Sequence, residues 1–247
     1  MIDGNFVKKA YEKSEVIEVY KKLANEGLWP EEKELFDKYC SSKKKILDVG
    51  CGTGRATFPL AEGEKEVLGI DFVPAMIDAA RLLKKEKASR ANFQVGNVLK
   101  LKIKPKTYDA VIFAYNGLNT IPQDEDRTKA LFEIKRVLKD DGVFIFSSHI
   151  RTLFDRKLFF YWIKQFFRVY IFRSKEKEEM GDRLSYRFGR YQYINLPGYI
   201  HLRLQLYYSG FTVVEARRKK SNKKEYPITL FVCKKNNSYP SLRGREI

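Results

Sequence analysis

The sequence predicts an α/β fold in which a mostly parallel sheet carries helices on both faces. The first observation is an alternation: apolar runs typical of buried strands and segments of helical periodicity follow one another across residues 43–149. The second is a strand pattern that runs directly into the glycine-rich turn Gly50–Gly54, as in the strand–turn–helix units of parallel sheets. The third is size, because 247 residues, 44% of them hydrophobic, suffice for one large domain with its own core.

The expected elements run from a helical N-terminal segment to a closing hairpin. Apolar residues at three- and four-residue spacings predict helices over residues 5–40, interrupted by Gly27 and Pro30. Gly142 is expected to end the helix that precedes the fifth strand. The strands are predicted at residues 46–49, 66–71, 92–95, 108–114, 143–147, 211–217 and 227–233, and the other helices at 55–62, 76–83, 127–138 and 197–209.

Residues 150–195 do not follow this alternation. They contain an aromatic and basic run, Leu158–Tyr170, and then tyrosines at near-alternate positions. We interpret the segment as an insertion between the fifth strand and the final helix. Its aromatic stripe predicts either a helix packed on the core or a wall of a ligand site.

The formal charge of +17 is unevenly distributed. Residues 1–149 carry 26 basic and 23 acidic side chains, whereas residues 150–247 carry 22 basic and 8 acidic ones. The excess positive charge therefore belongs to the C-terminal part of the chain. It indicates an anionic partner, an anionic surface or a contribution to solubility alone.

Cysteine and histidine usage argues against a disulfide framework and a metal site. Cys40, Cys51 and Cys233 are widely spaced, and neither His149 nor His201 stands at metal-ligand spacing from them. We therefore expect a reducing, cytoplasmic environment and no bound metal. We expect neither a secretory signal nor a membrane span, because the N-terminus lacks an apolar segment and the most apolar stretch is short and charged.

The turn at residues 50–54 predicts a nucleotide-like ligand, because glycine permits a left-handed backbone and lets a ligand approach the main chain. Asp71 ends the next predicted strand, where a carboxylate can accept both hydroxyls of a ribose. The dinucleotide fingerprint G-x-G-x-x-G is not present, since its last glycine is replaced by Arg55 or, in the second frame, by Thr57.

With these motifs the sequence resembles the class I S-adenosylmethionine-dependent methyltransferases. Five segments carry the resemblance in order: Ile46–Gly54, Leu68–Met76, Phe93–Val98, Tyr108–Ile112 and Arg136–Gly142. The resemblance covers residues 43–149 well and the closing hairpin loosely. It implies a Rossmann-like, seven-stranded, mostly parallel sheet with the last strand antiparallel, and S-adenosylmethionine as the cofactor.

We expect the chain to form a single methyltransferase domain with four parts. Residues 1–42 would form an N-terminal helical lid and residues 43–149 the cofactor-binding core. Residues 150–195 would form an aromatic and basic cap over the substrate, and residues 196–235 the final helix and β-hairpin.

The resemblance also implies which residues bind the cofactor. Asp48 and the turn would hold its methionine moiety, Asp71 its ribose hydroxyls, and Trp29 is a candidate lid residue or else part of the core. Asn97 stands where many family members have aspartate, and its carbonyl can still accept a hydrogen bond from the adenine amine. The full set is Asp48, Gly50, Cys51, Gly52, Thr53 and Gly54 at the methionine end, Asp71 at the ribose, Phe72, Met76, Asn97 and Val98 at the adenine, and Ala114 and Tyr115 beneath the sulfonium, with Trp29 as the lid.

Methyl transfer depends on alignment more than on a dedicated base. Tyr115 and Asn116, directly after the fourth strand, are expected to orient the acceptor. His149, at the end of the fifth strand, is the candidate base, with a purely structural role as its alternative, and His201 is expected to be structural or on the surface. The segment Tyr115–Leu118 lacks the Pro-Pro-Tyr type tetrad of nucleic-acid amine methylation.

A small-molecule acceptor is the favoured interpretation. One alternative is RNA, such as tRNA, bound through phosphate contacts and stacking by the basic C-terminal part; another is peripheral contact with an anionic membrane. A non-catalytic, basic cofactor-binding module is the alternative from a different class. The residues concerned are Phe159, Tyr161, Trp162, Phe166 and Tyr170 as walls of the cap, and Arg187, Arg190, Arg217, Arg218, Lys219, Lys220, Lys223 and Lys224 as RNA contacts.

Overall fold

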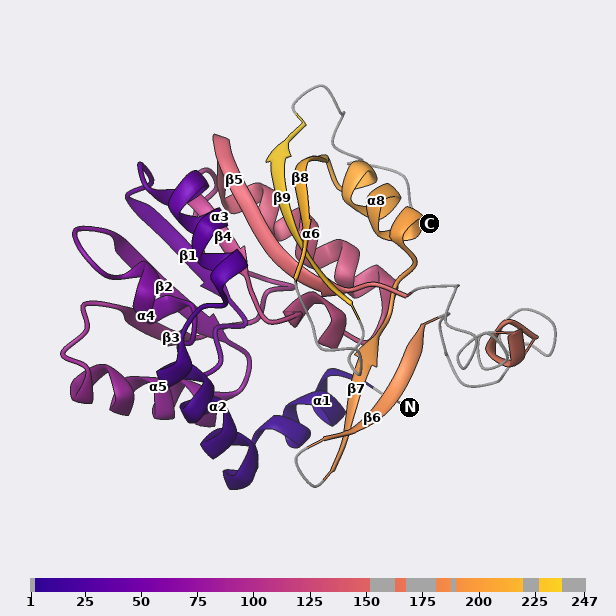
Figure 1. Ribbon diagram of the computed structural model, residues 1–247, viewed down its shortest axis with the longest axis horizontal. Helices are drawn as coiled ribbons and strands as arrows, with labels where there is room; N and C mark the ends of the chain where they lie inside the picture. The colour runs from indigo at the N-terminus through magenta and orange to yellow at the C-terminus, as the bar shows by residue number, and fades with distance from the viewer. Residues whose placement is uncertain (1–2, 152–162, 168–180, 188–189, 220–226, 237–247) are drawn as a thin grey trace.

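The computed structural model describes residues 3–151, 163–167, 181–187, 190–219 and 227–236 (Figure 1). Its centre is a seven-stranded sheet in the order β3-β2-β1-β4-β5-β9-β8. The strands β1 to β5 pair in parallel, whereas β9 pairs antiparallel with both β5 and β8. The expected Rossmann-like sheet with its last strand antiparallel is therefore confirmed. The strands are β1 Lys45–Val49, β2 Glu66–Asp71, β3 Asn92–Val95, β4 Tyr108–Phe113, β5 Leu138–His149, β8 Phe211–Arg218 and β9 Ile228–Lys235.

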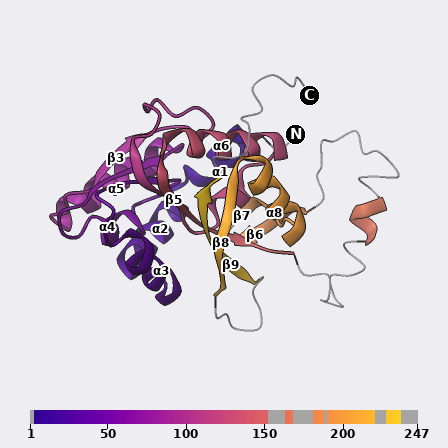
Figure 2. The ribbon, with the colours of Figure 1, turned by 90° about the horizontal axis from the view of Figure 1, so that it is seen from above.

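Helices cover both faces of the sheet, because successive strand residues point to opposite sides. On one face Ile46 and Ile112 pack with buried residues of α3 and α5, while on the other Leu47 and Val111 pack with α6 and α8. In both views α3, α4 and α5 lie around β1–β3, whereas α8 lies beside β8 and β9 (Figures 1 and 2). The helices are α1 Gly4–Tyr11, α2 Ser14–Glu26, α3 Pro30–Cys40, α4 Thr57–Leu60, α5 Pro74–Glu86, α6 Asp124–Val137 and α8 Tyr199–Tyr208, with a 3-10 turn η1 at Gly117–Thr120.

The N-terminal segment forms three helices where the sequence predicted two. The additional break follows Tyr11, and Lys13 is extended, with its carbonyl accepting from Val16 and Ile17 at 3.0 Å each. The break lets α1 and α2 take different directions, and both pack beside the start of α5 through a small cluster around the buried Met76. These helices reach over the carboxyl edge of the sheet, where the site lies.

The expected stop at Gly142 was wrong. The helix α6 ends at Val137, and Leu138 is already extended, so that Gly142 lies inside β5. The strand can start early because Leu138 pairs with Tyr108, ahead of a register shift in β4. Similarly, the helix after the glycine turn is shorter than predicted. It starts at Thr57, because the side chain of Arg55 is buried and bound by Glu32 of α3.

Within residues 150–195 the structure describes an antiparallel hairpin, β6 Asp182–Arg187 and β7 Arg190–Asn195. Its second strand packs against α1 and η1. Most of the aromatic run Leu158–Tyr170 lies outside the described residues, so the expected cap stays a prediction. Among the described residues, no helix is long and apolar enough to cross a membrane.

Candidate functional site

The site forms where four neighbouring parallel strands end. The glycine turn follows β1, Asp71 ends β2, Asn97 follows β3 and Tyr115 follows β4. Because parallel strands place their carboxyl ends at one edge, residues distant in sequence meet there. The predicted cofactor residues are thus brought together at a single edge of the sheet.

The glycine turn passes between two aromatic rings, which leave no room for side chains. Gly50 and Gly52 have φ of 62° and 54°, in the left-handed region that favours glycine. A Cβ at Gly50 would lie 2.6 Å from the ring of Phe113, and one at Gly52 would lie 3.1 Å from that of Tyr20. Thr53 fixes the turn to α2 by donating a 2.7 Å hydrogen bond to the carbonyl of Tyr20.

Asp71 joins the turn to the next helix. Its carboxylate accepts from the amides of Gly52 at 2.8 Å and Val73 at 2.9 Å. Burial raises the pKa of this carboxyl, against the hydrogen bonds from the backbone, which lower it. Each oxygen keeps a lone pair for a further donor, so that the carboxylate is positioned for the two hydroxyls of a ribose.

A cavity of about 1110 Å³, partly open to solvent, extends from Asp71; we call it the outer cavity. Near Asp71 the exposed ring of Phe72, the buried Met76 and Val98 line the cavity, an apolar lining that suits adenine; we call this part its nucleoside end. Asn97 also lines this end, and its Oδ1 accepts from the amide of Leu99 at 2.9 Å, which leaves the side-chain amino group free to donate to a base. The residues present fit the cofactor that the sequence predicted.

The other end of the outer cavity is largely apolar. It is lined by Phe113, Ile121 and Pro122. Two polar side chains also line the cavity here: Thr120 donates to the carbonyl of Gly117 at 2.7 Å, and Asp126 forms an ion pair with Lys129 at 2.9 Å through one of its two oxygens. Residues of α1, which belong to the predicted N-terminal lid but were not named as site residues, form a further wall: Gly4, Val7, Lys8 and Tyr11.

A smaller cavity, which we call the inner cavity, is lined by the predicted Asp48. This carboxyl is 1% exposed and accepts from the hydroxyl of Thr57 at 2.6 Å. Burial raises its pKa to about 7, although the hydrogen bond from Thr57 and the charge of Arg55 oppose the shift. Cys51 also lines this cavity, and burial raises the pKa of its thiol well above the usual value, as expected for a small packing residue.

Arg55 is the main residue of the site that the sequence did not reveal. It forms a bidentate ion pair with Glu32 at 2.7 and 2.8 Å and donates to the carbonyl of Gly27 at 2.9 Å. Its guanidinium lies 4.8 Å from the ring of Trp29 and 5.0 Å from that of Tyr115. Trp29, the predicted lid residue, thus packs on Arg55, and its ring centroid lies 5.4 Å from that of Tyr115. It does not line the outer cavity.

The three candidate catalytic residues lie at different positions relative to the two cavities. Tyr115 lines both cavities and, like Asn116, has a left-handed φ, of 54° and 61° respectively. Asn116 is buried, and its backbone N–H donates to the hydroxyl of Ser147 at 2.8 Å. Its side-chain oxygen Oδ1 has no hydrogen-bond partner. His149 is 4% exposed, its backbone is bound by Asn119, and it does not line either cavity.

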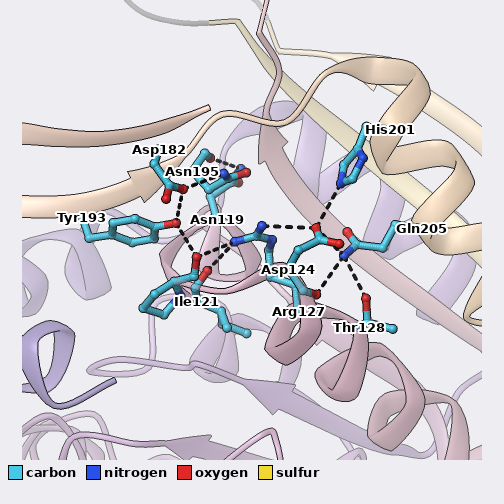
Figure 3. Close-up of polar contacts among 11 residues, drawn as sticks. Asn119, Ile121, Asp124, Arg127, Thr128, Asp182, Tyr193, Asn195, His201 and Gln205 are labelled. Carbon is cyan, nitrogen blue, oxygen red and sulfur yellow. Dashed lines mark hydrogen bonds and ion pairs between the residues drawn. The ribbon is translucent and has the colours of Figure 1, made fainter. Parts of the chain in front are cut away.

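A polar network fixes the apolar end of the outer cavity from outside (Figure 3). Arg127, which is buried, donates to the carbonyls of Ile121 and Pro122 at 2.8 and 3.0 Å. The hydroxyl of Tyr193, on β7, lies 2.6 Å from the Pro122 carbonyl. Asp124 accepts from Gln205 and lies 3.0 Å from the exposed His201 ring, both on α8. The hairpin and α8 therefore support the loop that carries Ile121 and Pro122.

Comparisons with known proteins agree with this geometry. A family model described as a methyltransferase domain matches residues 46–142. An uncharacterized methyltransferase of Schizosaccharomyces pombe is 36% identical over 114 residues, or 42% of this chain and 40% of the relative. A ubiquinone/menaquinone biosynthesis C-methyltransferase of Citrifermentans bemidjiense is 29% identical over 158 residues, or 61% and 60%. The matches thus span about half the length of these curated relatives.

Solved structures share the fold. A methyltransferase of Methanosarcina mazei, described as S-adenosylmethionine-dependent, has a TM-score of 0.70 at 20% identity and covers 85% of this chain and 98% of its own. The magnesium protoporphyrin IX methyltransferase of Synechocystis, solved with bound S-adenosylhomocysteine, has a TM-score of 0.65 at 16% identity, with 94% and 99% covered. At these identities the likeness establishes the sheet and its helices.

Proposed function

Because the chain belongs to the class I S-adenosylmethionine-dependent methyltransferases, we propose that it transfers the methyl group of this cofactor to a small-molecule acceptor. The observation that carries the proposal is the outer cavity. One end of it fits a nucleoside, the other is apolar, and Tyr115 lies between them. We infer that a cofactor and an acceptor lie end to end in this cavity.

When bound, S-adenosylmethionine would supply an electrophilic methyl carbon; attack on this carbon by the acceptor, in line with the carbon–sulfur bond, breaks that bond and releases S-adenosylhomocysteine. The chain's own residues would hold and align both molecules. Asp71 would bind the ribose and Asp48 the amino acid end, while Phe113 and Ile121 exclude water from the acceptor. Such positioning accounts for a large part of the rate of a displacement between two bound reactants.

The lining of the acceptor end favours an apolar or aromatic molecule. Phe113, Ile121 and Pro122 offer such a molecule apolar contacts. The carboxylate of Asp126 pairs with Lys129 through one oxygen only and can still accept from a polar group of the acceptor. In support, the names of relatives include demethylmenaquinone methyltransferases of Lactococcus lactis and Deinococcus radiodurans. A structural neighbour from Burkholderia thailandensis methylates 1,6-didemethyltoxoflavin, according to its description.

RNA is the less favoured acceptor, because two of the predicted RNA contacts, Arg217 and Lys219, are bound within the chain. Arg217 pairs with Glu34 and with Glu215, and Lys219 lies 4.5 Å from the ring of Trp29. Side chains paired in this way contribute less to phosphate binding than free cations do. Lys220, Lys223 and Lys224 lie outside the described residues.

The experiment that tests the proposal is transfer of a tritiated methyl group from S-adenosylmethionine into a fractionated cell extract. We expect label in the small-molecule pool with the intact protein and none with heat-inactivated protein. Label confined to RNA, protein or phospholipid would contradict the small-molecule proposal. No transfer to any pool, despite cofactor binding, would favour the non-catalytic module.

A further inference from the structure

The helix α8 carries apolar side chains on both of its faces. Its inward face packs Leu202 and Leu206 onto the sheet. Its outward face is also mostly apolar, although it is in contact with water: Ile200 is 74% exposed and Leu204 is 48% exposed. A surface helix normally turns charged and polar side chains outward. The exposed apolar and aromatic residues of α8 are Tyr199, Ile200, Leu204, Tyr207 and Tyr208.

This apolar face continues onto α6, which lies beside α8. Gln205 donates to the hydroxyl of Thr128 at 3.1 Å, and Lys135 lies against Gly210, just beyond the end of α8. Phe132, one turn after Thr128 on the same side of α6, is 37% exposed. We call Phe132 and the five exposed residues of α8 the α8 patch. Continuous apolar patches of this kind on a protein surface mark sites of interaction.

Cations lie along the whole length of the α8 patch. Arg151 lies beside the residue that precedes α8, the exposed Arg203 is in its middle, and Lys135 is at its end. The helix α8 itself contains no acidic residue. The neighbouring carboxylate of Asp124 accepts from Gln205 at 2.9 Å and from Arg127 at 3.2 Å. An apolar surface with cations beside it is complementary to an anionic lipid bilayer, whose headgroups attract the cations while its interior takes up the apolar side chains.

The same charges disfavour a second copy of the chain as the partner. A two-fold contact would place the α8 patch against itself, and with it the cations that border the patch in both copies. Each copy carries a formal charge of +17, and like charges brought together at an interface oppose binding. Tyrosine, which makes up half of the α8 patch, combines an apolar ring with a polar hydroxyl and is enriched where membranes meet water.

We propose that the α8 patch binds the surface of an anionic lipid bilayer. The helix lies in the plane of the interface, with Ile200 and Leu204 among the acyl chains and Arg203 at the headgroups. The helix α8 lies outside residues 46–142, which the family model matches. The docking surface thus belongs to the C-terminal part of the chain, where the excess positive charge is found.

The α8 patch lies next to the acceptor end of the outer cavity. Gln205 and His201 of α8 contact Asp124 at the start of α6 (Figure 3), and Asp126, two residues further on, lines the cavity. A protein docked through α8 therefore holds its acceptor end close to the bilayer, from which it takes up an apolar acceptor dissolved in the lipid. The uptake of an acceptor rests on the proposed function, whereas the binding to lipid does not.

The test is co-sedimentation with vesicles of phosphatidylcholine alone and with vesicles that also contain phosphatidylglycerol. We expect the wild type to bind the anionic vesicles, and more weakly as salt is added. Ile200→Ser/Leu204→Ser should lower the partition coefficient by about tenfold or more, because two apolar side chains no longer enter the bilayer. Arg203→Gln should lower it by about three- to fivefold. The controls Leu82→Ser and Arg90→Gln, at exposed positions on and after α5, should leave it unchanged.

A dye attached to the α8 patch reports the contact directly. The native Cys40, Cys51 and Cys233 are buried, so that an environment-sensitive maleimide dye attaches to the thiol introduced by Ile200→Cys. Its emission should shift to the blue when anionic vesicles are added, because the dye enters an apolar medium. The same dye on Leu82→Cys should show no shift.

Two outcomes would overturn the lipid docking: a wild type that does not bind anionic vesicles, and an Ile200→Ser/Leu204→Ser variant that binds them as the wild type does. A dimer in light scattering that this variant dissociates, without vesicle binding, would assign the α8 patch to a second copy instead. Vesicle binding requires neither cofactor nor acceptor, so that its failure leaves the proposed function in place. Vesicle binding without methyl transfer to any pool would overturn the proposed function alone.

Discussion

Asp48 shows how single residues of the site are held in a state that suits binding more than stability. Its carboxyl is buried with one hydroxyl donor, and its pKa is raised to about 7. The folded chain thus retains a proton that the unfolded chain releases near pH 4. As the pH rises from the unfolded pKa towards about 7, this residue lowers the stability of the ligand-free protein. An incoming ammonium group offsets that loss by pairing with the ionised form.

The affinity for S-adenosylmethionine should therefore depend on pH through Asp48. Below about pH 7 the carboxyl is protonated and cannot pair with the ammonium, so that Kd falls by up to about tenfold per pH unit as the pH rises to 7 and levels off above it. Asp48→Asn should bind more weakly and lose this dependence. Calorimetry between about pH 5.5 and 7.5 measures both. Parallel pH profiles for the variant and the wild type would rule out Asp48 as the titrating group.

At the scale of elements, the buried ion pair between Glu32 and Arg55 connects α3 to the glycine turn. Glu32 also accepts from the amide of Trp29 at 3.0 Å, and so holds the start of α3. The side chain of Glu32 is 1% exposed and that of Arg55 is 8% exposed. Removing one partner of such a pair leaves a buried charge without compensation.

We expect Glu32→Gln to lower the free energy of unfolding by about 3–5 kcal/mol, measured by urea denaturation. The double variant Glu32→Leu/Arg55→Leu should recover part of that loss, because it leaves no buried charge. Lys33→Ala on the exposed face of α3, whose ion pair with Asp37 is solvent-accessible, is the control and should leave the free energy of unfolding nearly unchanged. A Glu32→Gln variant as stable as this control would show that the pair does not anchor α3.

The elements could be predicted where the pattern is local. The strands β2 and β3 match the sequence prediction in full, because their apolar runs are bounded by clear turns. The early start of β5 could not be predicted, since it depends on pairing with Tyr108 from a distant strand. Site residues divide in the same way. Asp71 and the glycine turn could be predicted as cofactor residues from motifs local in sequence, whereas the contacts of Arg55 and Tyr20 in the site could not. Their roles arise from contacts with helices that periodicity alone does not orient.

At the scale of the whole molecule, the residues that line the outer and inner cavities all belong to residues 1–149 and none to the basic C-terminal part. The parallel strands β1–β4 and the glycine turn belong to the nearly balanced part of the chain, residues 1–149. In the basic part, Arg217 is paired across the molecule with Glu34 of α3. Much of the described site is therefore built from N-terminal helices and the parallel half of the sheet, with β7 and α8 supporting its rim (Figure 3).

The account depends most directly on binding of S-adenosylmethionine at Asp71. Titration calorimetry should show one site for S-adenosylmethionine and no binding of NAD. Asp71→Asn should weaken the affinity by about tenfold or more, because a charged acceptor of the ribose hydroxyls is lost. Asp78→Asn, at an exposed position on α5, should leave it unchanged. Binding of NAD without S-adenosylmethionine, or an Asp71→Asn variant with wild-type affinity, would contradict the account.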